Sequence, residues 1–182
     1  MKRVLITPVD PPPAALAELK EWLAITTSQD DSSLTDLLRA GIETCEAFTG
    51  VLPIRATCEE ILLAGTAWQR LATVPVQAIT SIEVLSDSGL RSALSAANYA
   101  VELDADGGGG VRLIGPASAG RLVVTFTAGL APDWGSLPDS LRHGIVRIAA
   151  HQYREREGSG AGPLPPASVA ALWRPWRRLR LT

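Results

Sequence analysis

Residues 31–63, DSSLTDLLRAGIETCEAFTGVLPIRATCEEILL, contain the change of pattern that decides the fold. From Leu34 to Phe48 the apolar residues recur at three- and four-residue steps, which predicts a helix over 31–49 that Gly50 closes. From about Ala56 the apolar period changes to two, which is typical of β-strands. We therefore expect a helix followed directly by a β region.

Upstream of this stretch, the sequence predicts an extended arm and a shorter helix. Prolines 11–13 exclude a helix across the arm, because proline lacks the backbone donor and disfavours α geometry in the residue before it. Residues 14–25 then carry Leu16, Leu19 and Trp22 on one stripe, which predicts an amphipathic helix.

Downstream, the short period-two segments are separated by turn sequences such as Asp87-Ser88-Gly89 and Gly115-Pro116. Short strands with tight turns predict antiparallel pairing, over a β region of about 56–128. Helical periodicity returns over 138–157, with Leu141, Ile145 and Ile148 on one face, and we expect a last short helix from near Ala167 to before Pro175.

These patterns together predict an α+β fold. We expect a helical bundle, made of two N-terminal helices plus a long C-terminal helix, with an inserted small antiparallel β-sheet or sandwich and an extended C-terminal tail. The expected organisation is a body over 1–157, a flexible Gly- and Pro-rich linker over 158–166, and a Trp- and Arg-rich docking segment over 167–182.

Composition narrows the class of protein. A chain of 182 residues with 46% hydrophobic residues can bury a core without metals or disulfides. It has only two cysteines, Cys45 and Cys58, for which free buried thiols in a reducing compartment are the simplest interpretation. We find neither a membrane span nor a signal peptide and expect synthesis in a cytoplasm, with no membrane partner.

Charge is unevenly distributed along the chain. The 17 basic and 19 acidic residues divide into 9 against 16 over residues 1–138 and 8 against 3 over residues 139–182. An acidic body with an arginine-rich end predicts that the end binds an acidic partner, unless it folds back on the body.

No pattern indicates catalysis, and we predict no catalytic residue, no cofactor and no metal. His143 and His151 lie eight residues apart on one expected helix, too far to share a metal ion. The pair Glu59-Glu60 fits the solvated edge of a strand better than acid–base work. We therefore expect a protein that is not an enzyme.

The unusual segment is 172–181, LWRPWRRLRL, with two of the five tryptophans and four arginines. Trp and Arg concentrate binding free energy at protein interfaces, and Pro175 predicts an extended peptide or broken turn. We expect a protein partner. Packing on the chain's own body and binding to nucleic acid remain open alternatives.

The order of these motifs resembles the head–tail connector, or adaptor, proteins of long-tailed phages, and especially those of the gene transfer agents of alphaproteobacteria. The resemblance spans nearly the whole chain. It is carried by residues 15–23 after the proline arm, 30–31, 46–50, 74–82, 98–99, 121–130, 137–138, 149–157 and the Leu-Trp-Arg-Pro-Trp-Arg-Arg end.

The resemblance implies a structural protein that forms a homo-oligomeric ring, a dodecamer, under the portal of a virion-like particle. It would join the DNA-filled head to a stopper or other tail-side neck protein, and DNA would pass through its channel without sequence recognition. The family has no catalytic residues. The residues assigned to portal contact by this resemblance are Trp173, Arg174, Trp176, Arg177, Arg178 and Arg180. The alternatives are a cytoplasmic small-molecule-binding or enzymatic domain and a nucleic-acid binder acting through the arginine-rich end.

Overall fold

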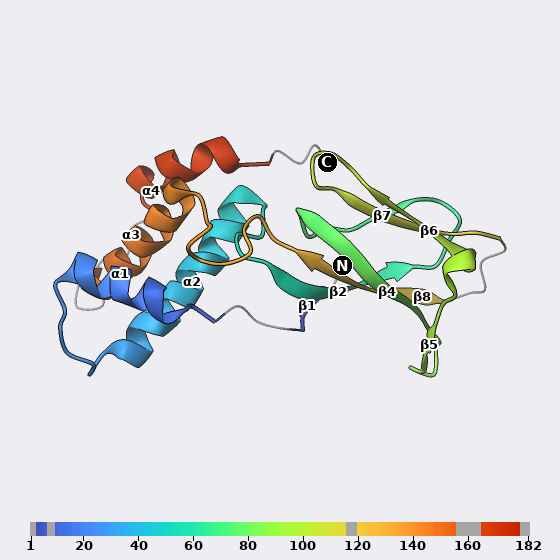
Figure 1. Ribbon diagram of the computed structural model, residues 1–182, viewed down its shortest axis with the longest axis horizontal. Helices are drawn as coiled ribbons and strands as arrows, with labels where there is room; N and C mark the ends of the chain where they lie inside the picture. The colour runs from blue at the N-terminus through green and yellow to red at the C-terminus, as the bar shows by residue number, and fades with distance from the viewer. Residues whose placement is uncertain (1–2, 7–9, 116–119, 156–164, 179–182) are drawn as a thin grey trace. The chain divides into compact units, whose positions relative to one another are not determined.

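Helix α2 (Asp31–Thr49) gives way to strand β2 (Ala56–Leu63) at the point where the apolar period changes. The computed structural model describes residues 3–6, 10–115, 120–155 and 165–178. Its contacts divide the chain into two units, which Figure 1 distinguishes by their secondary structure. We call residues 1–8 and 55–130 the β unit, and residues 9–54 and 131–182 the helical unit.

The β unit contains two antiparallel sheets. The five-stranded sheet has the order β1-β2-β8-β4-β5, and the three-stranded sheet has the order β3-β7-β6. The remaining elements are β1 (Arg3–Leu5), β3 (Gln69–Arg70), β4 (Val76–Leu85), β5 (Arg91–Ala93), the 3-10 turn η1 (Ala96–Asn98), β6 (Tyr99–Leu103), β7 (Gly109–Leu113) and β8 (Arg121–Ala128).

The core of the β unit follows the alternation of its strands. Strand β8 lies between β2 and β4, and its Leu122, Val124 and Phe126 are fully buried. In β2 every second residue from Ala56 to Leu62 is buried, as expected for strands with one face against a core.

Glu60 occupies one of the buried positions of β2 and is fully inaccessible to solvent. Its carboxylate accepts hydrogen bonds from the backbone N–H of Ala72 at 2.8 Å, the backbone N–H of Thr73 at 2.8 Å and the Thr73 hydroxyl at 2.7 Å. The expectation of a solvated strand edge is therefore wrong for Glu60. A buried carboxylate is tolerated because these three donors take the place of water.

The helical unit consists of α1 (Pro13–Leu23), α2, α3 (Asp139–Glu155), α4 (Ala167–Trp173) and the 3-10 turn η2 (Arg174–Trp176). Its core is aliphatic and contains the fully buried side chains of Leu19, Leu34, Leu38, Ile145 and Ile148. Polar contacts fix the helix ends.

Those polar contacts join three helices at the start of α2. The Tyr153 hydroxyl of α3 donates to Asp30 Oδ2 at 2.6 Å, and Lys20 Nζ of α1 lies 2.6 Å from Asp31 Oδ1. Gly50 closes α2 in the left-handed region, at φ +72°, as expected for a C-terminal glycine.

The predicted fold class is wrong. The eight strands among the described residues are not a small sheet inserted in a helical bundle, because they form two sheets with a core of their own. The expected extended tail is also wrong for residues 174–176, because they form η2 directly after α4. Val169 and Trp173, four residues apart, bury the inner face of α4, the short helix that we expected to begin near Ala167.

The expected flexible linker, residues 158–166, lies outside the described residues except for Pro165 and Pro166, which precede α4. Within the described part of the chain, no helix combines the length and apolar character that a membrane span requires.

Candidate partner-binding surface

The centre of the predicted docking segment is a buried anchor. Trp173 is fully inaccessible, and its indole packs against Phe48 of α2 with ring centroids 6.0 Å apart and an interplanar angle of 49°. Its Nε1 donates to the carbonyl oxygen of Leu141 on α3 at 3.4 Å. Trp173 therefore belongs to the core between α2 and α3, and its side chain is not a free surface.

Gly144 on α3 makes room for this indole. A Cβ atom placed at position 144 would lie 2.1 Å from Trp173 Nε1 and 2.7 Å from Trp173 Cε2. Real carbon atoms do not approach a ring this closely, so an alanine here forces the indole or the helix to shift.

We expect Gly144→Ala to lower the free energy of unfolding of the helical unit by about 1–3 kcal/mol, the usual cost of overpacking. Gly135→Ala is the control, because a Cβ there meets only Asp133 Oδ1 at 3.5 Å. Urea unfolding followed by tryptophan fluorescence measures both. Equal midpoints for the two variants would contradict the tight fit at Gly144.

Beyond Trp173, three contacts hold η2 and the residues after it on the same unit. Trp176 Nε1 donates to Ser140 Oγ at 2.9 Å, and the backbone N–H of Arg178 donates to the Thr49 carbonyl at the end of α2 at 2.8 Å. The guanidinium of Arg177 lies 5.6 Å from the centroid of the Phe48 ring. The end of the chain thus packs on its own unit at least as far as Arg178.

The six predicted contact residues therefore have different surroundings. Arg174 and Arg177 are exposed, and neither guanidinium forms an ion pair with any other described residue. Trp176 and Arg178 are half-buried, while Arg180 lies outside the described residues. Within the described part of this segment, the exposed charged side chains are Arg174 and Arg177.

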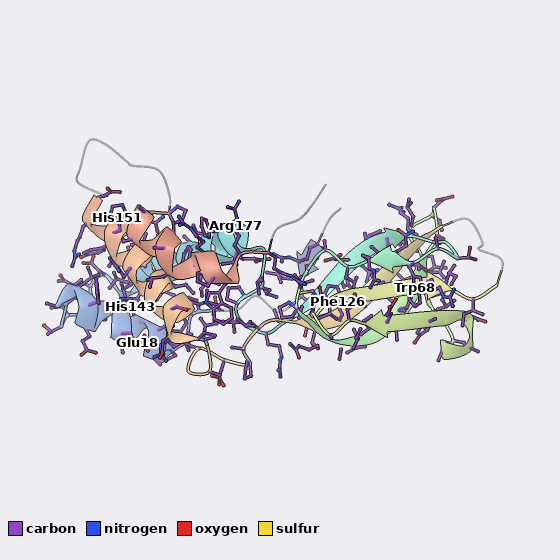
Figure 2. All side chains as sticks on the ribbon, turned by 90° about the horizontal axis from the view of Figure 1, so that it is seen from above. Glu18, Trp68, Phe126, His143, His151 and Arg177 are labelled. Carbon is purple, nitrogen blue, oxygen red and sulfur yellow. The ribbon has the colours of Figure 1, made fainter. Side chains whose placement is uncertain are left out.

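A second surface of the helical unit lies between α1 and α3. It is a groove of about 630 Å³ lined by Glu18, Glu21, Trp22, Asp139, Arg142, His143 and Val146. Trp22 remains 44% exposed and meets the edge of the His143 ring at a centroid distance of 5.1 Å. Figure 2 shows Glu18 and His143 close together on this side of the helical unit, with Arg177 apart from them.

The other residues that could support chemistry are inert or widely separated. Among the described residues, no group of three His, Cys, Asp or Glu side chains could hold a metal ion. Cys45 and Cys58 are buried free thiols, and burial raises the pKa of the Cys45 thiol to about 12. His151 Nε2 lies 3.2 Å from Glu155 Oε2 on the same helix. These side chains form no constellation of nucleophile and base.

Comparison with solved structures gives full-length matches. The chain superimposes on a protein in the neck of an empty gene transfer agent particle computed with C6 symmetry, at a TM-score of 0.80 and 27% identity, covering 100% of this chain and 98% of that one. The resemblance to neck proteins of gene transfer agents is confirmed. A chain in the virion of a native gene transfer agent particle matches at a TM-score of 0.77 and 26% identity, with the same coverage. A chain in the neck of a native particle computed with C12 symmetry matches at 0.76 and 28%, again over 100% and 98%.

No protein-family model and no curated protein matches the chain. The likeness to the gene transfer agent chains therefore rests on structure and on an identity of 26–28% along the entire sequence.

Two features that organise these surfaces are not evident from the sequence. The groove between α1 and α3 is one, because the sequence pattern places Trp22 on the apolar stripe of its helix, whereas the structure leaves it 44% exposed. The contact between Gly144 and the Trp173 indole is the other. The sequence around Gly144 does not predict it, because the two residues lie on different helices.

Proposed function

We propose that this chain is a structural component of the neck of a phage-like particle of the gene transfer agent type, and not an enzyme. The observation that carries the proposal is the match to gene transfer agent neck chains over 100% of this chain and 98% of theirs. A match that covers nearly all of both compared chains supports the same role more strongly than a match over one shared domain would.

In this proposal the copies form a homo-oligomeric ring, a dodecamer, at the junction of head and tail. The C12 symmetry used for the neck of the native particle supports a ring of identical chains. Closed rings are built from heterologous contacts, in which each copy uses two different surfaces. DNA passes through the channel of the ring, a stopper or other tail-side neck protein binds below, and the chain is made in the cytoplasm before assembly.

The portal contact is assigned to the exposed cations of the C-terminal segment. Arg174 and Arg177 present charge that is unpaired among the described residues, while Trp173 and the Arg178 N–H fix the segment that carries them. A rigid base reduces the entropy lost on binding, which favours a tight contact. Trp176, Arg178 and Arg180 complete the proposed contact.

We expect the double variant Arg174→Glu, Arg177→Glu to enter necks beneath DNA-filled heads at roughly a tenth of the normal level or less, because reversed charges oppose an acidic partner. The control is Arg121→Glu, which reverses an exposed arginine of the β unit. Quantitative mass spectrometry of purified particles measures incorporation, and circular dichroism verifies that each variant is folded. Normal incorporation of the double variant would refute the portal contact.

The ring itself is tested by electron microscopy of assembled necks. We expect density for copies of this chain arranged around the central axis. Necks that assemble fully without the chain would overturn the proposed function.

A further inference from the structure

A basic groove on the helical unit is separate from the C-terminal arginines discussed above. It has a volume of about 180 Å³ and lies among residues of α1, α3 and the start of α4. Its lining residues are Trp22, Arg147, His151, Arg154, Pro166, Ser168 and Val169.

Helical spacing brings the basic side chains of this groove together. Arg147, His151 and Arg154 follow one another at steps of four and three residues along α3, so they share one face of the helix. The first and last are seven residues apart, or about 10.5 Å along the axis. Arg154 is exposed, Arg147 is half-buried, and among the described residues neither forms an ion pair. Glu155 lies beside this row, and its carboxylate contacts His151.

An exposed aromatic side chain borders the row of cations. Trp22 is 44% exposed and lines the groove on the α1 side, with His143 against its ring. Cations that can contact phosphates beside an aromatic face that can stack on a base are the combination that non-specific nucleic-acid sites use.

The charge of the helical unit is segregated by segment, which favours a polyanion at this face. Residues 9–54 contain 2 basic and 8 acidic side chains, whereas residues 131–182 contain 8 arginines and 4 acidic side chains. The groove draws both of its arginines from the second segment. Because fields at a surface are dominated by nearby charges, the net charge of −2 for the whole chain does not repel a phosphate chain from it.

We propose that the groove of Trp22, Arg147, His151 and Arg154 binds the phosphodiester backbone of DNA without sequence recognition. This inference rests on the proposed neck function, in which DNA passes the ring. A single copy contributes only a few phosphate contacts and so binds weakly. A ring of copies would add such contacts on one DNA molecule, and their combined affinity would far exceed that of each.

The test measures binding of the purified full-length chain to a short DNA duplex and to a single strand of mixed sequence, by fluorescence anisotropy at about 50 mM salt and upward. We expect binding that weakens with salt. Arg147→Gln with Arg154→Gln should lower affinity about tenfold and reduce the slope of log K against log salt by about 2. Arg121→Gln is the matched control and should bind as the unmodified chain does. Absence of binding by the unmodified chain, or equal binding by all three proteins, would overturn the proposal.

Incorporation into particles separates this inference from the proposed function. We expect the Arg147→Gln, Arg154→Gln variant to enter necks normally while it binds DNA less tightly. If it enters necks and binds DNA as the unmodified chain does, the DNA site is refuted and the neck function stands. If it fails to enter necks but binds DNA normally, the groove contacts an acidic protein and the DNA site is again refuted. A chain that is absent from necks altogether would refute the function itself.

Discussion

Replacing Trp173 with alanine is expected to lower the free energy of unfolding of the helical unit by about 3–5 kcal/mol, the usual range for truncating a fully buried aromatic residue. The indole fills the space between Phe48 and Gly144, and neither neighbour can expand to occupy it. The substitution leaves a cavity and removes the main apolar contact of α4. Urea unfolding monitored by circular dichroism gives the value.

The matched control for this experiment is Trp176→Ala. Trp176 is half-buried and its ring nitrogen makes one hydrogen bond, to Ser140, so we expect a loss of only about 1–2 kcal/mol. Similar losses for the two variants would show that Trp173 is not the anchor of the segment. The comparison also matters for the incorporation assay. Absence of the Trp173→Ala variant from necks is expected from its loss of stability, whereas absence of a folded Arg174→Glu, Arg177→Glu variant would indicate loss of the proposed portal contact.

Replacing Glu60 with alanine is expected to destabilise the β unit by about 3–5 kcal/mol. The substitution removes a fully buried hydrogen-bond acceptor. The N–H groups of Ala72 and Thr73 and the Thr73 hydroxyl then lose the carboxylate oxygens to which they donate. Thermal or urea unfolding measures the loss. Amide hydrogen exchange gives a local readout, because the amides of Ala72 and Thr73 should lose protection first.

Two further variants distinguish the role of Glu60 from general damage to the strand. Glu60→Gln keeps the shape and one oxygen acceptor but turns an NH₂ group toward the donors, so its loss should be smaller than that of alanine yet clear. Glu59→Ala alters the adjacent residue, whose partner Arg91 is exposed, and should have little effect. Equal stability of the Glu59 and Glu60 alanine variants would contradict the structural role of the buried carboxylate.

The local periodicity of the sequence was informative where each element has a single face against a core. The stretch around Gly50 shows this, because α2 ends and β2 begins where the apolar period changes from helical to two. Glu60 follows the same period-two alternation. Its position in β2 places it on the buried face with Cys58 and Leu62, whereas its charge alone favours a solvent-exposed position.

The fold class was mispredicted because its decisive contacts are distant in sequence. β1 pairs with β2 across more than fifty residues, so the N-terminal arm gave no sign of joining a sheet. At Pro175 the sequence left an extended peptide or a broken turn open, and the structure has a 3-10 turn that accommodates the proline near its start. Trp173, one helical turn after Val169, supplies the burial that holds the preceding helix α4.

The bond from the Arg178 N–H to the Thr49 carbonyl has a mechanical consequence. It fastens the last described residues to the end of α2, where the chain leaves the helical unit toward β2. Tension applied along the C-terminal segment would therefore reach the end of α2 through Arg178 and the α2–α3 core through Trp173, so the load would be shared between a backbone hydrogen bond and a buried indole.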